Sequence, residues 1–177
     1  MFGLFKKPTK PPLTSPVVDL ARFSLDDLRI GQPVPTDSPY HPHFLPSPDE
    51  PGATRYHNPR SGLELTTKDG VVDSIFLALR KFSGRLARDG QPLDIRHEST
   101  ELEVATEFGE PYWKDVSDPL EVIDFHEFHS GEIEIQFEFP DMCQLEFITI
   151  LSPGILADPA QRKSYGVTKP WPPSSTP

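Results

Sequence analysis

The distribution of proline limits where this chain can form regular structure. Of its 22 prolines, twelve lie within residues 1–60, six lie from residue 153 onward, and four fall between. Proline has no backbone N–H and a fixed φ, so it interrupts helices and the interior of sheets. We therefore expect the packed core between about residues 62 and 151. A core of this length can fold without disulfides or metals, because domains above ~60 residues bury enough surface.

The same distribution predicts how the 177 residues are divided. We expect a flexible N-terminal arm over residues 1–16 and a single domain over residues 17–151, which includes a proline-rich loop at 32–59. Residues 152–177 have no hydrophobic periodicity, and we expect them to be extended or disordered. The length suits one domain, since roughly 150 residues per domain is typical.

Strand patterns dominate the predicted core. Residues 63–65 alternate between apolar and polar side chains, Lys68-Asp69-Gly70 form a hairpin turn, and residues 71–79 are apolar on both faces, as in a central strand. Three further strands, at about 120–128, 132–139 and 145–151, follow as an antiparallel meander. The predicted class is α+β, an antiparallel sheet with one main helix, at about 100–108, packed on one face.

The signals for that helix agree with one another. Thr100 is suited to the N-cap and Glu103 to the third helical position, which together form a capping box. Gly109 suits the left-handed residue that ends a helix, and Pro111 just beyond it prevents continuation. We therefore predict a helix from about residue 100 to residue 108.

Negative charge is concentrated in one part of the chain. Between Glu98 and Glu146 there are fifteen acidic residues and a single basic residue, Lys114, although the whole chain carries a net charge of −10. A dense negative surface attracts a basic partner and orients it, and it repels the phosphates of nucleic acids. The sequence thus favours a protein-binding surface for a basic protein, while a purely solubilising role remains an alternative.

The loop before residue 133 decides which side chains of the meander face solvent. A two-residue turn at Ser130 and Gly131 places Asp124 and His126 in the core, whereas a three-residue loop turns them outward. Because an unpaired buried carboxylate costs several kcal/mol, we expect the three-residue loop. The predicted partner-binding site lies on the resulting exposed face; it comprises Asp124, His126, Glu134 and Glu138, with the aromatic anchors Tyr112 and Trp113.

Catalytic and metal-binding patterns are weak in this sequence. Asp124 and His126 share a strand face and form the alternative hypothesis, a small hydrolase, but no nucleophile has an evident place beside them. His126 and His129 have the wrong spacing for a zinc-protease helix, and His41 and His43 have no acidic partner at ligand spacing. We therefore predict no enzyme activity, no metal and no cofactor. A scaffold or secretion accessory that binds through its proline-rich arms is a third possibility.

The remaining features concern the compartment. A lone cysteine, Cys143, excludes an intrachain disulfide and suits a reducing environment. No run of residues approaches the ~18 apolar residues of a membrane span, and the first residues do not form a signal peptide. We expect a cytoplasmic protein.

The segment Ser99-Thr100-Glu101-Leu102-Glu103-Val104, followed by Phe108-Gly109-Glu110-Pro111, resembles a motif of small bacterial α+β domains in which a helix ending in Gly-x-Pro packs on an antiparallel sheet. Such layouts occur in β-lactamase-inhibitor-like domains, in assembly-accessory lipoprotein domains and in immunity proteins of polymorphic toxin systems. The resemblance covers about residues 62–151. It implies a non-enzymatic, cytoplasmic binding domain of the immunity type, whose partner is a cognate toxin, and it supplies no catalytic residues.

Overall fold

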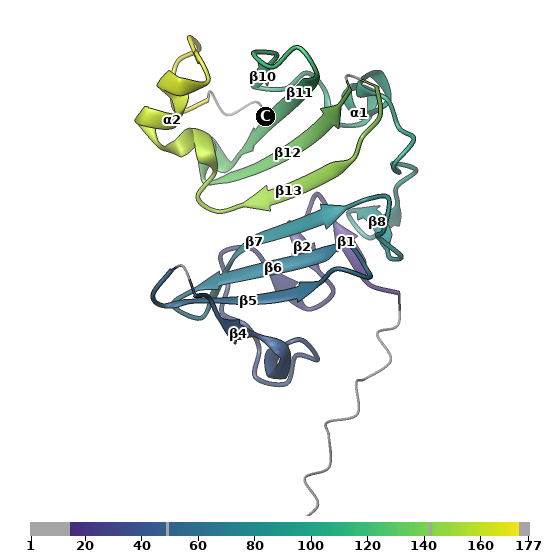
Figure 1. The fold of residues 1–177 in the computed structure, drawn as a ribbon, viewed down its shortest axis with the longest axis vertical. Coiled ribbons are helices and arrows are strands. Elements are labelled where there is room, and N and C mark those ends of the chain that lie inside the picture. The colour runs from purple at the N-terminus through teal and green to yellow at the C-terminus, as the bar shows by residue number, and fades with distance from the viewer. Residues whose placement is uncertain (1–14, 49, 142, 174–177) are drawn as a thin grey trace, which may run out of the picture.

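The computed structural model describes residues 15–48, 50–141 and 143–173, which fold into two β-sheets with few helices (Figure 1). The large sheet has eight strands in the order β10-β11-β12-β13-β7-β6-β5-β4, and the small sheet has five in the order β3-β2-β1-β8-β9. This architecture agrees broadly with the predicted α+β class. Strands of the large sheet are β4 (Leu45–Pro46), β5 (Ala53–Asn58), β6 (Leu63–Lys68), β7 (Val71–Ala78), β10 (Trp113–Asp115), β11 (Glu121–Phe128), β12 (Ile133–Pro140) and β13 (Phe147–Leu151).

The large sheet consists of two antiparallel meanders that meet at β7 and β13. One meander runs from β4 to β7 and the other from β10 to β13, so the sheet has an approximate twofold arrangement (Figure 1). A Gly-x-Pro sequence precedes each meander, residues 31–33 before the first and residues 109–111 before the second. Their glycines, Gly31 and Gly109, have positive φ values of 74° and 79°. The predicted strands, their antiparallel order and the central position of residues 71–78 are confirmed.

Turn residues explain why the strands form where they do. Asp69 and Gly70 have φ values of 52° and 79°, which is the geometry of the two-residue hairpin predicted from the sequence. The two meanders also have matching four-residue loops, at 59–62 and 129–132, between their second and third strands. These loops fix the register of the long strands and therefore decide which side chains are buried.

The small sheet covers one face of the large sheet. It comprises β1 (Val17–Asp19), β2 (Ser24–Leu25), β3 (Leu28–Arg29), β8 (Arg85–Arg88) and β9 (Gln91–Pro92), with β1 parallel to β8. The Asp19 carboxylate holds the two segments together by accepting hydrogen bonds from the backbone N–H groups of Ala21, Arg22, Asp89 and Gly90. A single hydrophobic core lies between the sheets and includes Leu20, Leu25, Leu65, Leu77 and Ile148.

The predicted helix is present as α1 (Glu101–Phe108). Thr100 and Glu103 form the capping box, since the Thr100 side chain accepts from the Glu103 N–H and the Glu103 carboxylate accepts from the Thr100 N–H. Gly109 follows with a φ of 79°. Val104 is fully buried, and the Phe108 ring lies 5.1 Å from the ring of Phe137 in the large sheet.

Two segments differ from the sequence-based expectation. The predicted loop at 32–59 contains two strands of the large sheet, β4 and β5, and the 3-10 helix η1 (His41–His43). Residues 152–173, the part of the predicted tail that the structure describes, are not wholly extended or disordered as expected: they include the 3-10 helix η3 (Ile155–Ala157) and the helix α2 (Pro159–Ser164), which lie over the β10 end of the large sheet (Figure 1). The predicted N-terminal arm lies, apart from residues 15 and 16, outside the described residues.

Candidate functional site

The register of β11 and β12 places Asp124 and His126 in the core, and the prediction that they face solvent is wrong. Asp124 pairs with Phe137 and His126 with Ile135, and only 1% and 4% of these two polar residues is exposed. The loop has four residues, His129 to Glu132, not three, so it gives the same parity as the rejected two-residue turn. His129, Ser130 and Gly131 all adopt positive φ in the helical turn η2 (His129–Gly131), which makes this compact loop possible.

The predicted exposure of Asp124 and His126 was wrong because the other face of the sheet is covered as well. Phe125 is fully buried there, and its ring packs at 5.1 Å against Tyr165, which follows α2. Because the C-terminal segment supplies a second apolar cover, both faces of β11 are buried at this end. Hydrophobic alternation therefore could not identify the solvent face of this strand.

Asp124 and His126 are not joined as the hypothesis of a catalytic pair requires. No hydrogen bond joins them within the described part of the chain, and Asp124 Oδ1 and His126 Nε2 are both buried without a hydrogen-bond partner there. Burial raises the pKa of Asp124 to about 6, against the opposing effect of Lys114, whose Nζ lies 3.9 Å from Oδ1. Burial lowers the pKa of His126 to about 4, so its imidazole is neutral at pH 7.

Glu134 is also internal, contrary to the predicted exposed position, and it holds the C-terminal segment. It is completely buried, and its carboxylate accepts hydrogen bonds from the backbone N–H groups of Ile155 at 3.2 Å and Leu156 at 3.0 Å, at the start of η3. Gln136 Nε2 donates to the same carboxylate at 2.5 Å. These donors stabilise the Glu134 charge without any basic side chain.

Glu127 stands directly across from Glu134 in the register. Burial, together with the nearby negative charge of Glu134, raises the pKa of Glu127 to about 9, although Arg162 opposes the shift. Glu127 therefore carries a proton at pH 7, and both of its carboxyl oxygens are buried without a hydrogen-bond partner among the described residues. The two acids form a buried structural pair and are not accessible to a partner.

The predicted aromatic anchors contact the chain's own C-terminal segment. The Tyr112 hydroxyl donates to the carbonyl oxygens of Lys169 and Pro170, at 3.2 and 2.9 Å. Trp113 Nε1 donates to the Tyr165 carbonyl oxygen at 3.1 Å. Both side chains are half-buried, so their first role is to fix residues 165–170.

Beyond this C-terminal cover, the same face of the large sheet is open. Along β12 the covered side chains Glu134 and Gln136 are buried, whereas Glu138 is only half-buried. Directly paired residues on this face form rows that cross the strands from β12 over β13, β7 and β6 to β5. One such row consists of Gln136, Thr149, Phe76, Glu64 and His57. The side chains of β13, β7 and β6 that point to this face are half-buried, while their neighbours point into the core. We call this uncovered part, from Glu138 to His57, the open sheet face.

An aromatic pair lies at the centre of the open sheet face. The rings of Phe76 on β7 and Phe147 on β13 stack with their centroids 5.5 Å apart and their planes at 26°. Both residues are half-buried, so part of each remains accessible. They lie on the strands where the two meanders meet, and Thr149 and Ala78 are their cross-strand neighbours.

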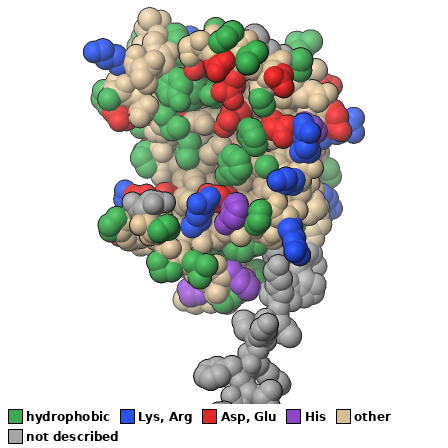
Figure 2. Space-filling view, in the orientation of Figure 1, with side chains coloured by type: hydrophobic (Ala, Val, Ile, Leu, Met, Phe, Trp, Pro, Cys, Tyr) green, Lys and Arg blue, Asp and Glu red, His purple; other side chains and the backbone are tan. Residues whose placement is uncertain are grey.

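Carboxylates border the aromatic pair toward β10. Asp115, Glu121 and Glu138 are half-buried, and none of them forms an ion pair within the described residues. Burial and the charge of Glu121 raise the pKa of Glu138 to about 6, while a hydrogen bond with Thr149 opposes the shift. The space-filling view shows acidic side chains running down the upper half of the molecule on the viewed face (Figure 2).

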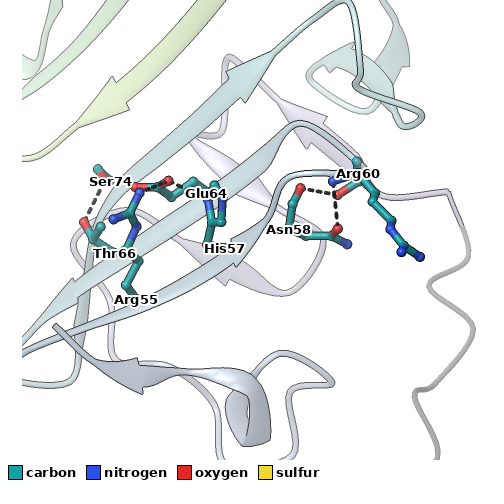
Figure 3. A network of polar contacts seen from close by, with 8 residues as sticks. Arg55, His57, Asn58, Arg60, Glu64, Thr66 and Ser74 are labelled. Carbon is teal, nitrogen blue, oxygen red and sulfur yellow. Dashed lines mark hydrogen bonds and ion pairs between the residues drawn. The ribbon is translucent and has the colours of Figure 1, made fainter. Parts of the chain in front are cut away.

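A mixed polar network borders the open sheet face toward β5 (Figure 3). Glu64 on β6 accepts from Arg55 and forms a 2.8 Å contact with His57 Nδ1, both residues of β5. Thr66 Oγ1 contacts Asp73 and the Ser74 hydroxyl, at 2.5 and 2.6 Å. Here the charges are internally balanced, so the uncompensated negative charge of this face lies at its β10–β12 end.

Sequence reasoning missed the importance of Phe76, Phe147 and Glu121. The alternation of residues 71–79 did indicate that Phe76 and Ala78 face away from the main core. Nothing in the sequence showed that this second face is covered at one end and open at the other, because that depends on where residues 152–173 pack.

Two further observations concern metal ions and membranes. Within residues 15–48, 50–141 and 143–173, no group of three or more His, Cys, Asp or Glu side chains lies close enough to hold a metal ion. In the same residues no helix has the length and apolar character needed to cross a membrane.

Comparison with models of protein families, with curated proteins and with solved structures gave no match. The class that the fold and site define is therefore a two-sheet α+β chain with an acidic, aromatic, partly uncovered sheet face.

Proposed function

We propose that this chain is a non-enzymatic binding domain that neutralises a basic bacterial toxin by covering the toxin's active-site surface. The toxin would dock on the open sheet face. The observation that carries the proposal is the position of the Phe76–Phe147 pair, which is half-buried and lies next to Asp115, Glu121 and Glu138, three residues that have no cation of their own among the described residues.

The carboxylates favour a cationic partner. The raised pKa of Glu138 means that its negative charge is poorly solvated and lies close to that of Glu121. A lysine or arginine from a partner would relieve this repulsion, so binding of a basic surface gains electrostatic energy that the free chain lacks. The net charge of −10 also accelerates encounter with such a partner.

The aromatic pair favours a protein partner. Large half-exposed rings at the centre of a surface act as binding hot spots, since their burial contributes most of the interface energy. Thr149, Thr66 and Ser74 surround the rings with hydroxyl groups that can hydrogen-bond to a partner's backbone.

The toxin as partner comes from the sequence resemblance to immunity proteins and from the chemistry of such targets. Enzymes that act on polyanions carry basic clefts, which an acidic face can occlude. In this proposal the domain acts in the cytoplasm, where the exposed Cys143 stays reduced. The helix α1 would support the docking sheet from behind, through Val104 and Phe108.

The alternatives receive less support. A hydrolase needs Asp124 and His126 in contact, and they make no hydrogen bond to each other in the described residues. A scaffold that binds through proline-rich arms needs accessible arms. Residues 45–46 and 53–58 of the predicted loop instead form strands, and residues 152–173 pack on the domain.

The test uses the purified product of the neighbouring reading frame as the candidate toxin and measures its binding by surface plasmon resonance. Neutralising Glu121 and Glu138 as E121Q/E138Q should slow association and reduce its salt dependence, because two charges of the docking face are lost. The matched control D94N/E98Q changes the net charge equally at exposed positions outside this face.

A second variant, F76A/F147A, should weaken binding at least about tenfold, as expected for hot-spot residues. It should also fail to protect cells that express the toxin. Equal binding by the wild type, E121Q/E138Q and F76A/F147A, with circular dichroism showing all three folded, would contradict the proposal.

A further inference from the structure

A second candidate site lies at the end of β11, and its lining includes none of the residues named for the open sheet face. It is a cavity of about 1050 Å³ bounded by the end of α1, the segment that contains Ala21 and Phe23, the loop after β11, and residues Lys169 and Pro173 of the C-terminal segment. Ligand pockets in proteins have volumes of about 300–1,000 Å³, so this space suits a small molecule.

The walls of the cavity are aromatic. Phe23, Phe108, Tyr112 and Phe128 line it. Phe23 and Phe128 already contact each other with centroids 5.1 Å apart and their planes tilted at 56°. A flat ligand ring can extend this arrangement, because aromatic rings prefer tilted or edge-to-face neighbours at 4.5–7 Å.

One side chain of the same wall has a buried polar atom without a partner. His126 lines the cavity, it is 4% exposed, and its Nε2 has no hydrogen-bond partner among the described residues. The rings of Phe108 and Phe137 hold the imidazole in place, at 6.2 and 5.3 Å and nearly perpendicular to it. A buried polar atom left without a partner is unfavourable by about 1–3 kcal/mol, and a ligand that supplies the partner recovers this energy.

The charges around the cavity favour an uncharged ligand. Burial keeps the His126 imidazole neutral at pH 7, and Glu127 carries its proton under the same conditions. Lys169 and Glu110 are exposed, and the Lys169 Nζ lies over the Tyr112 ring at 5.7 Å from its centroid. A charged ligand would therefore lose water at the His126 wall without meeting an opposite charge there.

We propose that this cavity binds a small, uncharged aromatic molecule that carries a hydroxyl group, with the ring between Phe23, Phe108 and Phe128 and the hydroxyl on His126 Nε2. A hydroxyl both donates and accepts, so it suits either tautomer of the imidazole. This site is separate from the docking face of the proposed function, and neither depends on the other.

The experiment compares phenol with toluene, which has the same shape but no hydrogen-bonding group. Each is titrated into the full-length protein and followed by two-dimensional NMR of the backbone amides and of the histidine ring nitrogens. We expect saturable shifts at residues 108, 126 and 128, a shift of the His126 Nε2 resonance with phenol alone, and about fivefold tighter binding of phenol, as one hydrogen bond provides.

The variant H126F should bind both compounds equally, whereas the control H41Q, which alters an exposed histidine outside the cavity, should keep the preference for phenol. Equal affinity of the wild type for phenol and toluene would overturn the proposal. So would shifts confined to other parts of the molecule, or the lack of saturable binding. The wild-type comparison is decisive even where H126F does not fold.

Discussion

At the scale of single residues, the acidic positions of the meander have two different roles that the sequence does not distinguish. Glu134 and Glu138 are four residues apart on one strand and point to the same face, yet one holds η3 and the other borders the open sheet face. The alternation of residues 132–139 correctly predicts that they share a face. It could not predict the burial of Glu134, because the backbone N–H groups of Ile155 and Leu156 come from a segment without hydrophobic periodicity.

The Glu127–Glu134 pair makes stability depend on pH in a defined direction. The pKa of Glu127 rises from 4.5 to about 9 on folding. Between these values the folded chain keeps a proton that the unfolded chain releases, so the free energy of unfolding decreases as pH rises. One proton corresponds to at most about 1.4 kcal/mol per pH unit.

The variant E127Q should remove this dependence, because an amide has nearly the shape of the protonated acid but does not titrate. Urea denaturation from about pH 7 to about pH 8.5 measures the effect in a range where folded Asp124, Glu138 and His126 no longer titrate. The exposed neighbour variant E132Q should keep the wild-type slope. Parallel curves for E127Q and the wild type would show that Glu127 is already ionised in the folded state.

At the scale of elements, signals between residues close in sequence predicted most of the fold. The error in which side chains of β11 are buried came from one loop that is one residue longer than predicted. The capping box of α1 and the hairpin at Asp69 and Gly70 are fixed by residues close in sequence, and both are present as predicted. The loop at 129–132 has no such unambiguous signal, since Ser130-Gly131 fits turns of different lengths. Because this loop has four residues and not three, the register shifts by one residue, and Asp124 and His126 lie in the core instead of on the predicted surface.

That loop is stabilised by the C-terminal segment, and Gly131 is the point of contact. Gly131 has a φ of 88°, and a Cβ added there would lie 2.4 Å from Cζ2 of Trp171. Trp171 in turn packs under the guanidinium of Arg162, at 4.7 Å. A side chain at Gly131 must therefore displace the tryptophan.

We expect G131A to lower the free energy of unfolding by at least about 2 kcal/mol, because left-handed strain and the displaced ring add together. The matched control G166A has a φ of 66° and no atom within 4 Å of the added Cβ, so it should lose only about 1 kcal/mol. Urea denaturation followed by tryptophan fluorescence measures both. Equal losses would mean that Trp171 does not hold this loop.

At the scale of the whole molecule, the two meanders share one core and should unfold together. They are joined by the pairing of β7 with β13, and Leu77 and Ile148 are cross-strand neighbours there with no exposed surface. The sequence predicted both sets of strands but not that they form one sheet, because no local signal specifies which strands pair across 70 residues. The open sheet face exists only because of this pairing, since Phe76 and Phe147 come from different meanders.

The variant L77A tests this unity. Truncation of a buried leucine should lower the free energy of unfolding by about 2–5 kcal/mol. Both tryptophans, Trp113 and Trp171, belong to the second meander and its cover, whereas Leu77 lies in the first. If the sheet is one cooperative unit, tryptophan fluorescence and far-ultraviolet circular dichroism should show the same shifted transition in urea.

The control variant L45A, at an exposed leucine, should leave both transitions within about 0.5 kcal/mol of the wild type. A fluorescence transition that L77A does not move would mean that the second meander folds alone, and the Phe76–Phe147 pair could not then be a fixed docking surface.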